Sequence, residues 1–463
     1  MSGIFGIVSR KDCRQTLFYG TDYHSHLGTK KAGLAVFNHR ISRCIHDIST
    51  SQFKSKFIEE LDKLKGKEGI GVISDLEPQP IIISCSFGDF AIVTSGLLNN
   101  KNKMAKDIMK QGGSFSEMSS GGINTTEVIG KLIAQKDNIV LGIENVFDKI
   151  TGSISLLILA KEGIYAVRDI SGKTTLVVGR DKESIAVTSE TCAFPNLGFR
   201  PFMELQPGEI VLLTKEGLRK KKILGKDSKI CAFLWIYTGY PASSYEGISV
   251  EKVRENCGIN LAKGDKTKAD LVTGVPDSGI AHALGYSIAS GIPYRRPLVK
   301  YTDGYGRSYT PPSQKIRNKI AKLKLIPVKS VIENKKIVVC DDSIVRGTQL
   351  KNQAIEKLWQ NGAKEIHVRI ACPPLMFPCP YLLATRTKKE LAARRIIKKL
   401  TKGKKFNIEK FLDEKSVSYQ EMIKAIKKEI GVTSLKYQTI KEMVKAIGLP
   451  KEKICLYCWN GKK

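Results

Sequence analysis

The chain has 463 residues, 42% of them hydrophobic, which is enough apolar material for two or three domains with separate cores. It contains no run of about eighteen apolar residues and no basic N-terminal segment followed by an apolar one, so no membrane span or secretion signal is indicated and the cytoplasm is the expected compartment. Eleven cysteines without such a signal favour reduced thiols or metal ligands over a disulfide framework.

The formal net charge of +31 is unusual, and a dense basic tract runs from Arg386 to Lys405. Such a tract can bind nucleic acid. Aromatic residues make up only 7% of the chain and no recognisable nucleic-acid module accompanies the tract, so stacking platforms are scarce. A solvated helical face is therefore the favoured interpretation, and salt-dependent RNA binding is the distant alternative.

Residues 1 to about 225 show short strand patterns alternating with polar turns, with helical patterns at 53–64 and 126–134. This alternation suits two sheet layers covered by helices, an αββα arrangement. A Lys-rich, Gly-containing segment at 219–229 interrupts it. We therefore expect a first domain at 2–225.

After this boundary strands alternate with helices, as in a parallel sheet. The expected strands are 271–275, 337–340 and 365–370, and the expected helices are 253–263, 282–290 and 352–361. A second domain is expected at 226–385. From 386 to 463 the pattern indicates a helical tail that ends in a cysteine pair.

The most informative segment of the second domain joins a strand, two carboxylates and a loop of small residues. Its β-branched residues 337–339 predict a buried strand, and the turn that follows offers backbone N–H groups where the next helix begins. Ligands of open α/β sheets bind at such strand ends. The candidate ligand-binding residues are Asp341, Asp342, Ser343, Arg346, Gly347 and Thr348. The two carboxylates suit ribose hydroxyls or Mg²⁺, and the alternative is an ordinary turn with an Asp helix cap.

This segment resembles the phosphoribosyl pyrophosphate (PRPP) signature of type I phosphoribosyltransferases. The chain also opens Ser2-Gly-Ile-Phe-Gly6 and closes Cys455-Leu-Tyr-Cys458-Trp, and both ends resemble glutamine PRPP amidophosphoribosyltransferase. That family begins purine synthesis by replacing the pyrophosphate of PRPP with ammonia from glutamine. The resemblance implies an N-terminal class II glutamine amidotransferase domain of the Ntn-hydrolase type, a type I phosphoribosyltransferase domain with a parallel sheet, and a helical C-terminal tail.

Two further segments complete the transferase site that the resemblance implies. The turn Gly274–Gly279 lies where the family binds pyrophosphate, and the family's aspartate and serine are present as Asp277 and Ser278. Ser278, Asp341 and Asp342 are the expected magnesium ligands. A capping turn is the alternative interpretation of this loop. The polar segment 300–317 resembles the family's lid, in which Arg307 and Arg317 are expected to stabilise charge on the departing pyrophosphate.

The closing Cys455 and Cys458 pair alone fits zinc, a redox pair or an iron–sulfur cluster. Some members of the family carry a four-iron four-sulfur cluster, whose ligands correspond here to Cys231, Cys379, Cys455 and Cys458. The resemblance therefore implies a structural [4Fe-4S] cluster, with a zinc site as the second candidate.

The N-terminal domain departs from the family at its catalytic positions. The family's nucleophilic cysteine is replaced by Ser2, a degenerate and weaker nucleophile. The family's His-Arg-Gly-Gln-Glu reads His26-Leu-Gly-Thr-Lys30 here, Gly-His-Thr-Arg-Tyr reads Gly71-Val-Ile-Ser-Asp75, His-Asn-Gly-Asn-Leu reads Thr94-Ser-Gly-Leu-Leu98, and Ser-Asp-Thr-Glu reads Asn124-Thr-Thr-Glu127. These changes remove two arginines, an oxyanion-hole amide and an aspartate, so we expect the glutaminase to be lost.

The leading hypothesis is an amidophosphoribosyltransferase-like enzyme that makes 5-phosphoribosylamine from PRPP and ammonia, free or delivered by a partner. The alternative is a PRPP- or nucleotide-binding pseudoenzyme that regulates an active paralogue. The segment Gly239-Tyr-Pro-Ala-Ser243, where the family has Ala-Arg-Pro-Asp-Ser, favours the alternative. A homo-oligomer is expected in either case, because the family self-associates.

Overall fold

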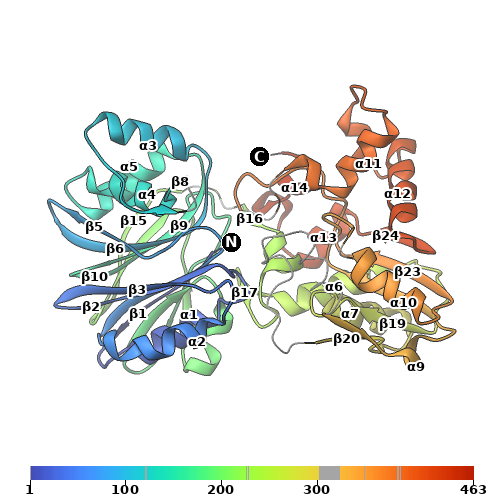
Figure 1. The fold of residues 1–463 in the computed structure, drawn as a ribbon, viewed down its shortest axis with the longest axis horizontal. Coiled ribbons are helices and arrows are strands. Elements are labelled where there is room, and N and C mark those ends of the chain that lie inside the picture. The colour runs from blue at the N-terminus through green and yellow to red at the C-terminus, as the bar shows by residue number, and fades with distance from the viewer. Residues whose placement is uncertain are drawn as a thin grey trace. The chain divides into compact units, whose positions relative to one another are not determined.

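The computed structural model describes residues 2–119, 122–225, 227, 229–301, 324–348, 350–382, 385 and 387–462 (Figure 1). These residues form two compact units. The first contains residues 1–231, 242–246 and 380–383, and the second contains residues 232–241, 247–379 and 384–463. Among the described residues, no helix combines the length and apolarity that a membrane crossing requires.

The first unit is built on two antiparallel sheets. The seven-stranded sheet has the order β13-β11-β12-β1-β4-β2-β3, and the six-stranded sheet has the order β15-β14-β10-β9-β6-β5. The strands of the first sheet are β1 Ser2–Ser9, β2 Lys31–Asn38, β3 Arg40–Asp47, β4 Glu68–Ser74, β11 Val177–Arg180, β12 Ser184–Thr188 and β13 Arg200–Glu204. Those of the second are β5 Ile81–Cys85, β6 Gly88–Leu98, β9 Gly152–Ala160, β10 Gly163–Val167, β14 Glu209–Thr214 and β15 Gly217–Ile223.

Helices cover the outer face of each sheet. Packed against the seven-stranded sheet are α1 Arg14–Asp22 and α2 Phe53–Phe57, the latter continued by a 3₁₀ turn at Ile58–Lys63. Packed against the six-stranded sheet are α3 Lys101–Lys110, α4 Thr125–Ala134 and α5 Ile139–Lys149. Short elements are the hairpin β7 Met118–Ser119 and β8 Gly122–Ile123, 3₁₀ turns at Thr191–Ala193 and Pro195–Leu197, and the two-residue strands β16 Ile230–Cys231 and β17 Ser244–Tyr245.

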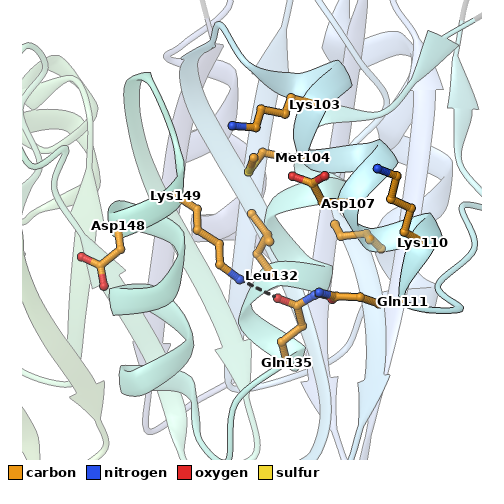
Figure 2. A pocket seen from close by; sticks show the side chains of 10 residues that line it. Lys103, Met104, Asp107, Lys110, Gln111, Leu132, Gln135, Asp148 and Lys149 are labelled. Carbon is orange, nitrogen blue, oxygen red and sulfur yellow. Dashed lines mark hydrogen bonds between the residues drawn. The ribbon is translucent and has the colours of Figure 1, made fainter.

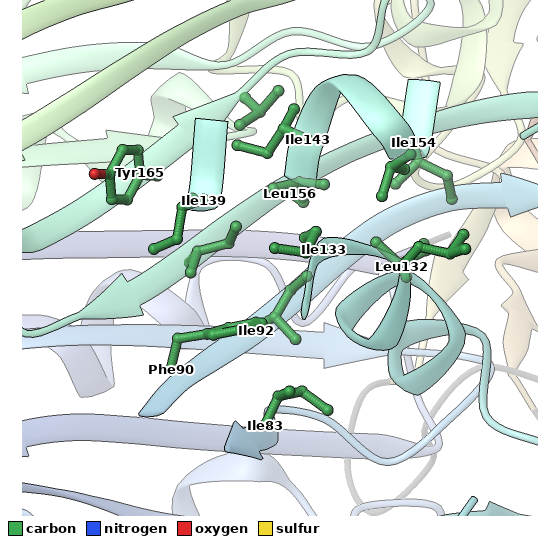
Figure 3. Close-up of a cluster of buried hydrophobic side chains, with 14 of the residues drawn as sticks. Ile83, Phe90, Ile92, Leu132, Ile133, Ile139, Ile143, Ile154, Leu156 and Tyr165 are labelled. Carbon is green, nitrogen blue, oxygen red and sulfur yellow. The ribbon is translucent and has the colours of Figure 1, made fainter. Parts of the chain in front are cut away.

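The alternating side chains of the strands explain this layering, because each sheet presents apolar residues on both faces. Ile4 and Val72 of one sheet pack with Val93 and Leu157 of the other between the sheets. A second cluster, in which Ile133 of α4 packs over Ile92, fills the space between the six-stranded sheet and its helices (Figure 3). The αββα arrangement expected from the sequence is thereby confirmed.

The second unit has a parallel sheet of order β19-β22-β23-β24. Its strands are β19 Leu271–Gly274, β22 Lys336–Asp341, β23 Glu365–Ile370 and β24 Ser434–Tyr437, and β20 Leu298–Lys300 pairs antiparallel with β21 Leu325–Pro327 beside it. The helices are α6 Val250–Ala262, α7 Ile280–Ser290, α9 Lys329–Ile332, α10 Glu356–Gln360, α11 Ala392–Leu400, α12 Val417–Ile430, α13 Ile440–Ile447 and α14 Tyr457–Asn460. Shorter elements are π-helical turns at Leu234–Thr238 and Leu350–Ile355, 3₁₀ turns at Lys388–Glu390, Ile408–Phe411 and Lys451–Lys453, and the strands β18 Ile248–Ser249 and β25 Ile454–Cys455.

Helices α6 and α7 approach each other closely through two glycines. A Cβ on Gly258 would lie 1.9 Å from the His282 carbonyl oxygen, and one on Gly285 would lie 1.9 Å from the Glu255 carbonyl oxygen. Only glycine permits this backbone contact.

The C-terminal tail contributes to the sheet as well as to the helices. Strand β24 extends the parallel sheet beyond β23, and Gln438 N–H donates to the Ile370 carbonyl at 2.9 Å. The tail is mostly helical, as expected, but its strand was not foreseen from the sequence.

Candidate functional site

The expected phosphate-binding residues come from two loops that follow the adjacent parallel strands β19 and β22. Ser278 Oγ in the first loop donates to Asp341 Oδ1 in the second at 3.1 Å. The backbone N–H of Asp342 donates to the same oxygen at 3.0 Å, and the Ser343 hydroxyl donates to the Asp342 carboxylate. The structure therefore brings together, at the carboxyl edge of the sheet, four of the residues expected from the sequence.

Tight backbone contacts hold the first loop against the second strand. The N–H of Val275 donates to the Cys340 carbonyl at 3.0 Å, and that of Gly279 donates to the Val275 carbonyl at 2.8 Å. A Cβ on Gly279 would lie 2.3 Å from the Cys340 carbonyl oxygen, and one on Gly274 would lie 2.3 Å from the Gly279 carbonyl oxygen. Both glycines are required by this close approach.

The two adjacent carboxylates are buried, with Asp341 7% exposed and Asp342 5% exposed. Burial raises the pKa of Asp341 well above its ordinary value, and the neighbouring Asp342 carboxylate raises this pKa further. Burial also raises the pKa of Asp342, while nearby hydroxyls and the Arg254 guanidinium oppose that rise. Two such carboxylates side by side favour a bound cation, which would relieve their repulsion.

Oxygen donors in this set suit Mg²⁺, which proteins hold through one or two carboxylates together with substrate phosphates and water. Among the described residues, no three His, Cys, Asp or Glu side chains form a ready-made metal site. The carboxylate pair with Ser278 therefore offers oxygen donors without forming a complete metal site among the described residues.

The rest of the second loop leads into the helical turn at Leu350–Ile355 and is contacted by residues before and in α11. Gly347 has a φ of 78°, which favours glycine, and Thr348 is exposed at the start of the next helical turn. The Arg346 guanidinium is half exposed and lies 3.1 Å from Glu390 Oε1. The loop thus presents backbone and hydroxyl groups to solvent while its arginine is paired.

Asp277 lies in the first loop, and its carboxylate forms an ion pair with the Lys300 ammonium. Both side chains are partly exposed. The two lid arginines, Arg307 and Arg317, lie outside the described residues. Lys300 and Leu325 pair at the base of the segment that contains them.

Arg254 was not singled out by the sequence analysis. It is buried on α6 and donates to the carbonyls of Trp235 at 2.8 Å, Tyr237 at 3.0 Å and Gly239 at 2.8 Å. It therefore fixes the turn that leads into the altered segment 239–243, and it also favours the ionised form of Asp342. The sequence does contain a signal for its burial, because Arg254 lies beside the apolar positions Val250, Val253 and Cys257 of the helix.

In the first unit, Ser2 is 3% exposed at the start of β1, opposite Ser74 of β4. Its Oγ donates to Ser74 Oγ at 3.0 Å, and the Ser95 hydroxyl donates to the Ser2 carbonyl at 2.5 Å. Leu76 N–H donates to Ser74 Oγ at 3.1 Å. A network of small hydroxyls therefore occupies the positions where the family has a nucleophile, an arginine and an oxyanion-hole amide.

The neighbouring loops are tied to each other. The backbone N–H and hydroxyl of Thr29 donate to Asp75 Oδ1 at 2.7 and 3.1 Å. Leu27, at the family's arginine position, is buried. Thr125, at the family's aspartate position, donates from its N–H and its hydroxyl to the Glu77 carboxylate at 2.5 and 2.8 Å. Leu27 and Ser74, at the two arginine positions, cannot pair with the carboxylate of an amino acid as a guanidinium does. Thr125 has no carboxylate to offer a substrate amine.

Three of the four expected cluster cysteines, Cys379, Cys455 and Cys458, lie in the second unit. The Cys458 carbonyl accepts from Met376 N–H at 2.9 Å and from Phe377 N–H at 3.0 Å, next to Cys379 in the chain. Ala232 N–H donates to the Cys455 carbonyl at 3.4 Å. Cys231 ends the first unit. The backbone therefore places the Cys379 segment beside Cys458, although no three potential metal ligands come together in the part of the chain that the structure describes.

A separate hollow of about 500 Å³ lies among α3, α4 and α5 of the first unit (Figure 2). It is lined by Lys103, Met104, Asp107, Ile108, Lys110, Gln111, Leu132, Gln135, Asp148 and Lys149. None of the expected site residues lines it.

Comparison with known proteins gives a consistent result along the whole chain. A family model described as a glutamine amidotransferase domain matches residues 69–196. The chain is 33% identical to an amidophosphoribosyltransferase of Methanocaldococcus jannaschii over 100% of this chain and 97% of that protein. It is 31% identical to the Bacillus subtilis amidophosphoribosyltransferase, over 99% and 93% of the two chains.

A solved structure of the B. subtilis glutamine PRPP amidotransferase, complexed with ADP and GMP, superposes with a TM-score of 0.85 at 30% identity. It covers 99% of this chain and 96% of that one. These similarities confirm the family expected from the sequence and the combination of the two domain types. The chain belongs to the amidophosphoribosyltransferase family.

Proposed function

We propose that this protein transfers ammonia, and not the amide nitrogen of glutamine, to PRPP to form 5-phosphoribosylamine. The observation that carries the proposal is the contrast between its two sites. The transferase loops bring Ser278, Asp341 and Asp342 together, as a phosphoribosyl ligand requires. The Ser2 hydroxyl is instead buried against Ser74.

The transferase reaction breaks the bond between C1 of the ribose and the pyrophosphate oxygen and forms a bond between C1 and nitrogen. The ammonium product then loses a proton to solvent. In this proposal the backbone groups of loop 274–279 bind the pyrophosphate and those of loop 343–348 bind the 5-phosphate. The Asp341 and Asp342 carboxylates orient the ribose hydroxyls. Mg²⁺, when bound with Ser278 and the two carboxylates, would neutralise charge on the leaving pyrophosphate.

We further propose an iron–sulfur cluster with Cys231, Cys379, Cys455 and Cys458 as its ligands. It is supported by the backbone contacts that hold the Cys379 segment against Cys458. Thiolates suit iron–sulfur clusters and zinc alike, so zinc is the second candidate.

A second candidate function is a PRPP-binding regulator that joins the oligomer of an active paralogue. It is favoured by the altered residues 239–243, which lie at the turn that Arg254 holds. Tyr240 there is 46% exposed. Both functions require PRPP binding, and they differ in whether pyrophosphate is released.

The test is pyrophosphate release from PRPP and Mg²⁺ by anaerobically purified protein, with either ammonium chloride or glutamine as donor. The control is Asp341→Asn, whose remaining Oδ1 can still accept from Ser278 and from Asp342 N–H. Release with ammonium alone, abolished in the variant, is expected. Tight PRPP binding without release would establish the regulator, and release with glutamine would overturn the loss of glutaminase.

A further inference from the structure

A surface of positive charge lies on α11 and on the turn that follows it. We define this basic surface by the residues Arg394, Lys398, Lys402, Lys404 and Lys405. The stretch 391–408 contains no aspartate or glutamate. The apolar residues Ala392, Ala393, Ile396 and Ile397 are buried, whereas the four lysines are exposed. The helix is thus anchored by one face and offers cations on the other.

Neighbouring acidic groups neutralise other cations of α11 but not this surface. Glu429 of α12 binds Arg395 at 2.7 Å and Lys399 at 3.0 Å. The Arg394 guanidinium stands 5.4 Å from the centre of the Phe406 ring. Within the described residues, the four lysines of the basic surface have no carboxylate within 4 Å. Their charge is therefore available to an outside anion.

The first turns of α11 rest directly on the phosphate-binding loop. Ala392 N–H donates to the Val345 carbonyl at 2.7 Å, and Arg395 Nη2 donates to the Arg346 carbonyl at 3.1 Å. With a rise of 1.5 Å per residue, Lys398 lies about 9 Å along the helix from Ala392. Gly403 N–H donates to the Lys398 carbonyl at 2.9 Å, so the following turn stays near it. The basic surface begins within about one Debye length of the loop at physiological salt.

The loops themselves are poor at attracting a polyanion. They bring the buried carboxylates of Asp341 and Asp342 to one edge of the sheet, while the cations Lys300 and Arg346 beside them are paired with Asp277 and Glu390. A free molecule with a phosphate and a pyrophosphate would be repelled by this edge unless a nearby field of opposite sign outweighed it. The basic surface supplies that field.

We propose that the basic surface is an electrostatic capture site that guides polyphosphorylated ligands, PRPP in particular, to the loop at 341–348. The proposal rests on the function proposed above and adds a kinetic role for residues that touch no reacting atom. Steering of this kind raises association rates by about ten to a thousandfold and weakens as salt is added. The lysines accelerate encounter and leave the chemical step unchanged.

The test is the combined variant Lys398→Glu, Lys404→Glu, Lys405→Glu, in which PRPP association is followed by stopped-flow fluorescence across ionic strength. We expect the association rate to fall roughly tenfold at low salt, with the rates of variant and parent converging as added salt shortens the Debye length. The rate at saturating PRPP should stay unchanged.

The matched control is Lys268→Glu, Lys335→Glu, Lys364→Glu, which changes the net charge by the same amount. These exposed lysines precede β19, β22 and β23, at the opposite edge of the sheet. The six residues of β22 separate that edge from the loop by about 20 Å. The control should associate with PRPP like the parent.

Three results would overturn the proposal or its basis. Equal rates and salt slopes in the variant and the parent would show that the surface has no role in capture. Equal loss in the control variant would assign the effect to net charge alone. Absence of PRPP binding by the parent in calorimetry would reject the proposed function itself.

The neutral variant with glutamine at the same three positions should show a smaller loss of association rate than the glutamate variant. Circular dichroism verifies that each variant folds.

Discussion

At the scale of single residues, replacing Ser2 by the family's cysteine measures whether a nucleophile alone restores glutamine-dependent activity. We expect Ser2→Cys to show no glutamine-dependent pyrophosphate release, because Leu27 and Ser74 provide no guanidinium for a substrate carboxylate and Ser95 provides no side-chain amide. Loss of one oxyanion donor alone costs about a hundredfold to a thousandfold in rate. Ammonium-dependent release should stay within about twofold of the parent. Ser2→Ala is the control, and glutamine-dependent turnover by the cysteine variant would show that a substrate clamp has survived.

Glu204 gives a prediction for pH. Burial raises its pKa to about 7, and Glu246 adds to the rise while Arg168 opposes it. A carboxyl whose pKa is higher in the folded state binds more protons there, so its contribution to stability is present below its ordinary pKa of about 4.5 and is lost as pH rises towards 7. We expect Glu204→Gln to raise the free energy of unfolding by about 1–3 kcal/mol at pH 8 and by little at pH 4.

Thermal unfolding across this pH range measures the Glu204 effect. The glutamine keeps an oxygen that can accept from Glu246 N–H, as Glu204 Oε1 does at 3.1 Å. The exposed Glu421→Gln on α12 serves as the control and should follow the parent at every pH. A Glu204→Gln melting temperature that tracks the parent at pH 8 would contradict the assignment.

At the scale of elements, the contact of α6 with α7 depends on the absence of a side chain. We expect Gly285→Ala to lower the free energy of unfolding by about 2–4 kcal/mol, because the new Cβ would meet the Glu255 backbone, which cannot rotate away. Ile288→Ala lies one turn further along α7, where the side chain is 68% exposed, and should change stability by less than about 0.5 kcal/mol. Urea unfolding of both variants measures the difference, and equal stabilities would show that the two helices can separate.

Elements with a strong hydrophobic period could be predicted from the sequence, and those set by long-range pairing could not. The β-branched run at 337–339 predicted β22, and the family resemblance implied that Ser278 meets Asp341. Strand β24 was missed because its four residues carry a lysine and stand between two helices, so only its pairing with β23 reveals it. Arg254 was missed because its role depends on three carbonyls of a distant turn.

At the scale of the whole molecule, the C-terminal residues fasten distant segments of the chain. Trp459 stacks on Phe233 with ring centres 5.2 Å apart, and Tyr457 meets the Phe377 ring at 6.1 Å. The two aromatic residues flank Cys458 in the chain, and the first contact links residues more than two hundred positions apart. A cluster bound by the cysteines would reinforce the same fastening, since structural metal sites contribute directly to folding.

We therefore expect anaerobically purified protein to contain about four iron atoms per chain, and Cys458→Ser to lose them. The melting temperature of this variant should fall by roughly 5–10 °C, because losing a structural metal costs several kcal/mol. Cys85→Ser, on the half-exposed end of β5, is the control and should retain its iron. Metal analysis distinguishes the alternatives, because one zinc per chain would replace the iron–sulfur assignment. If the parent contains no metal and Cys458→Ser melts at the same temperature as the parent, the aromatic contacts, and not a metal, hold the tail to the parallel sheet.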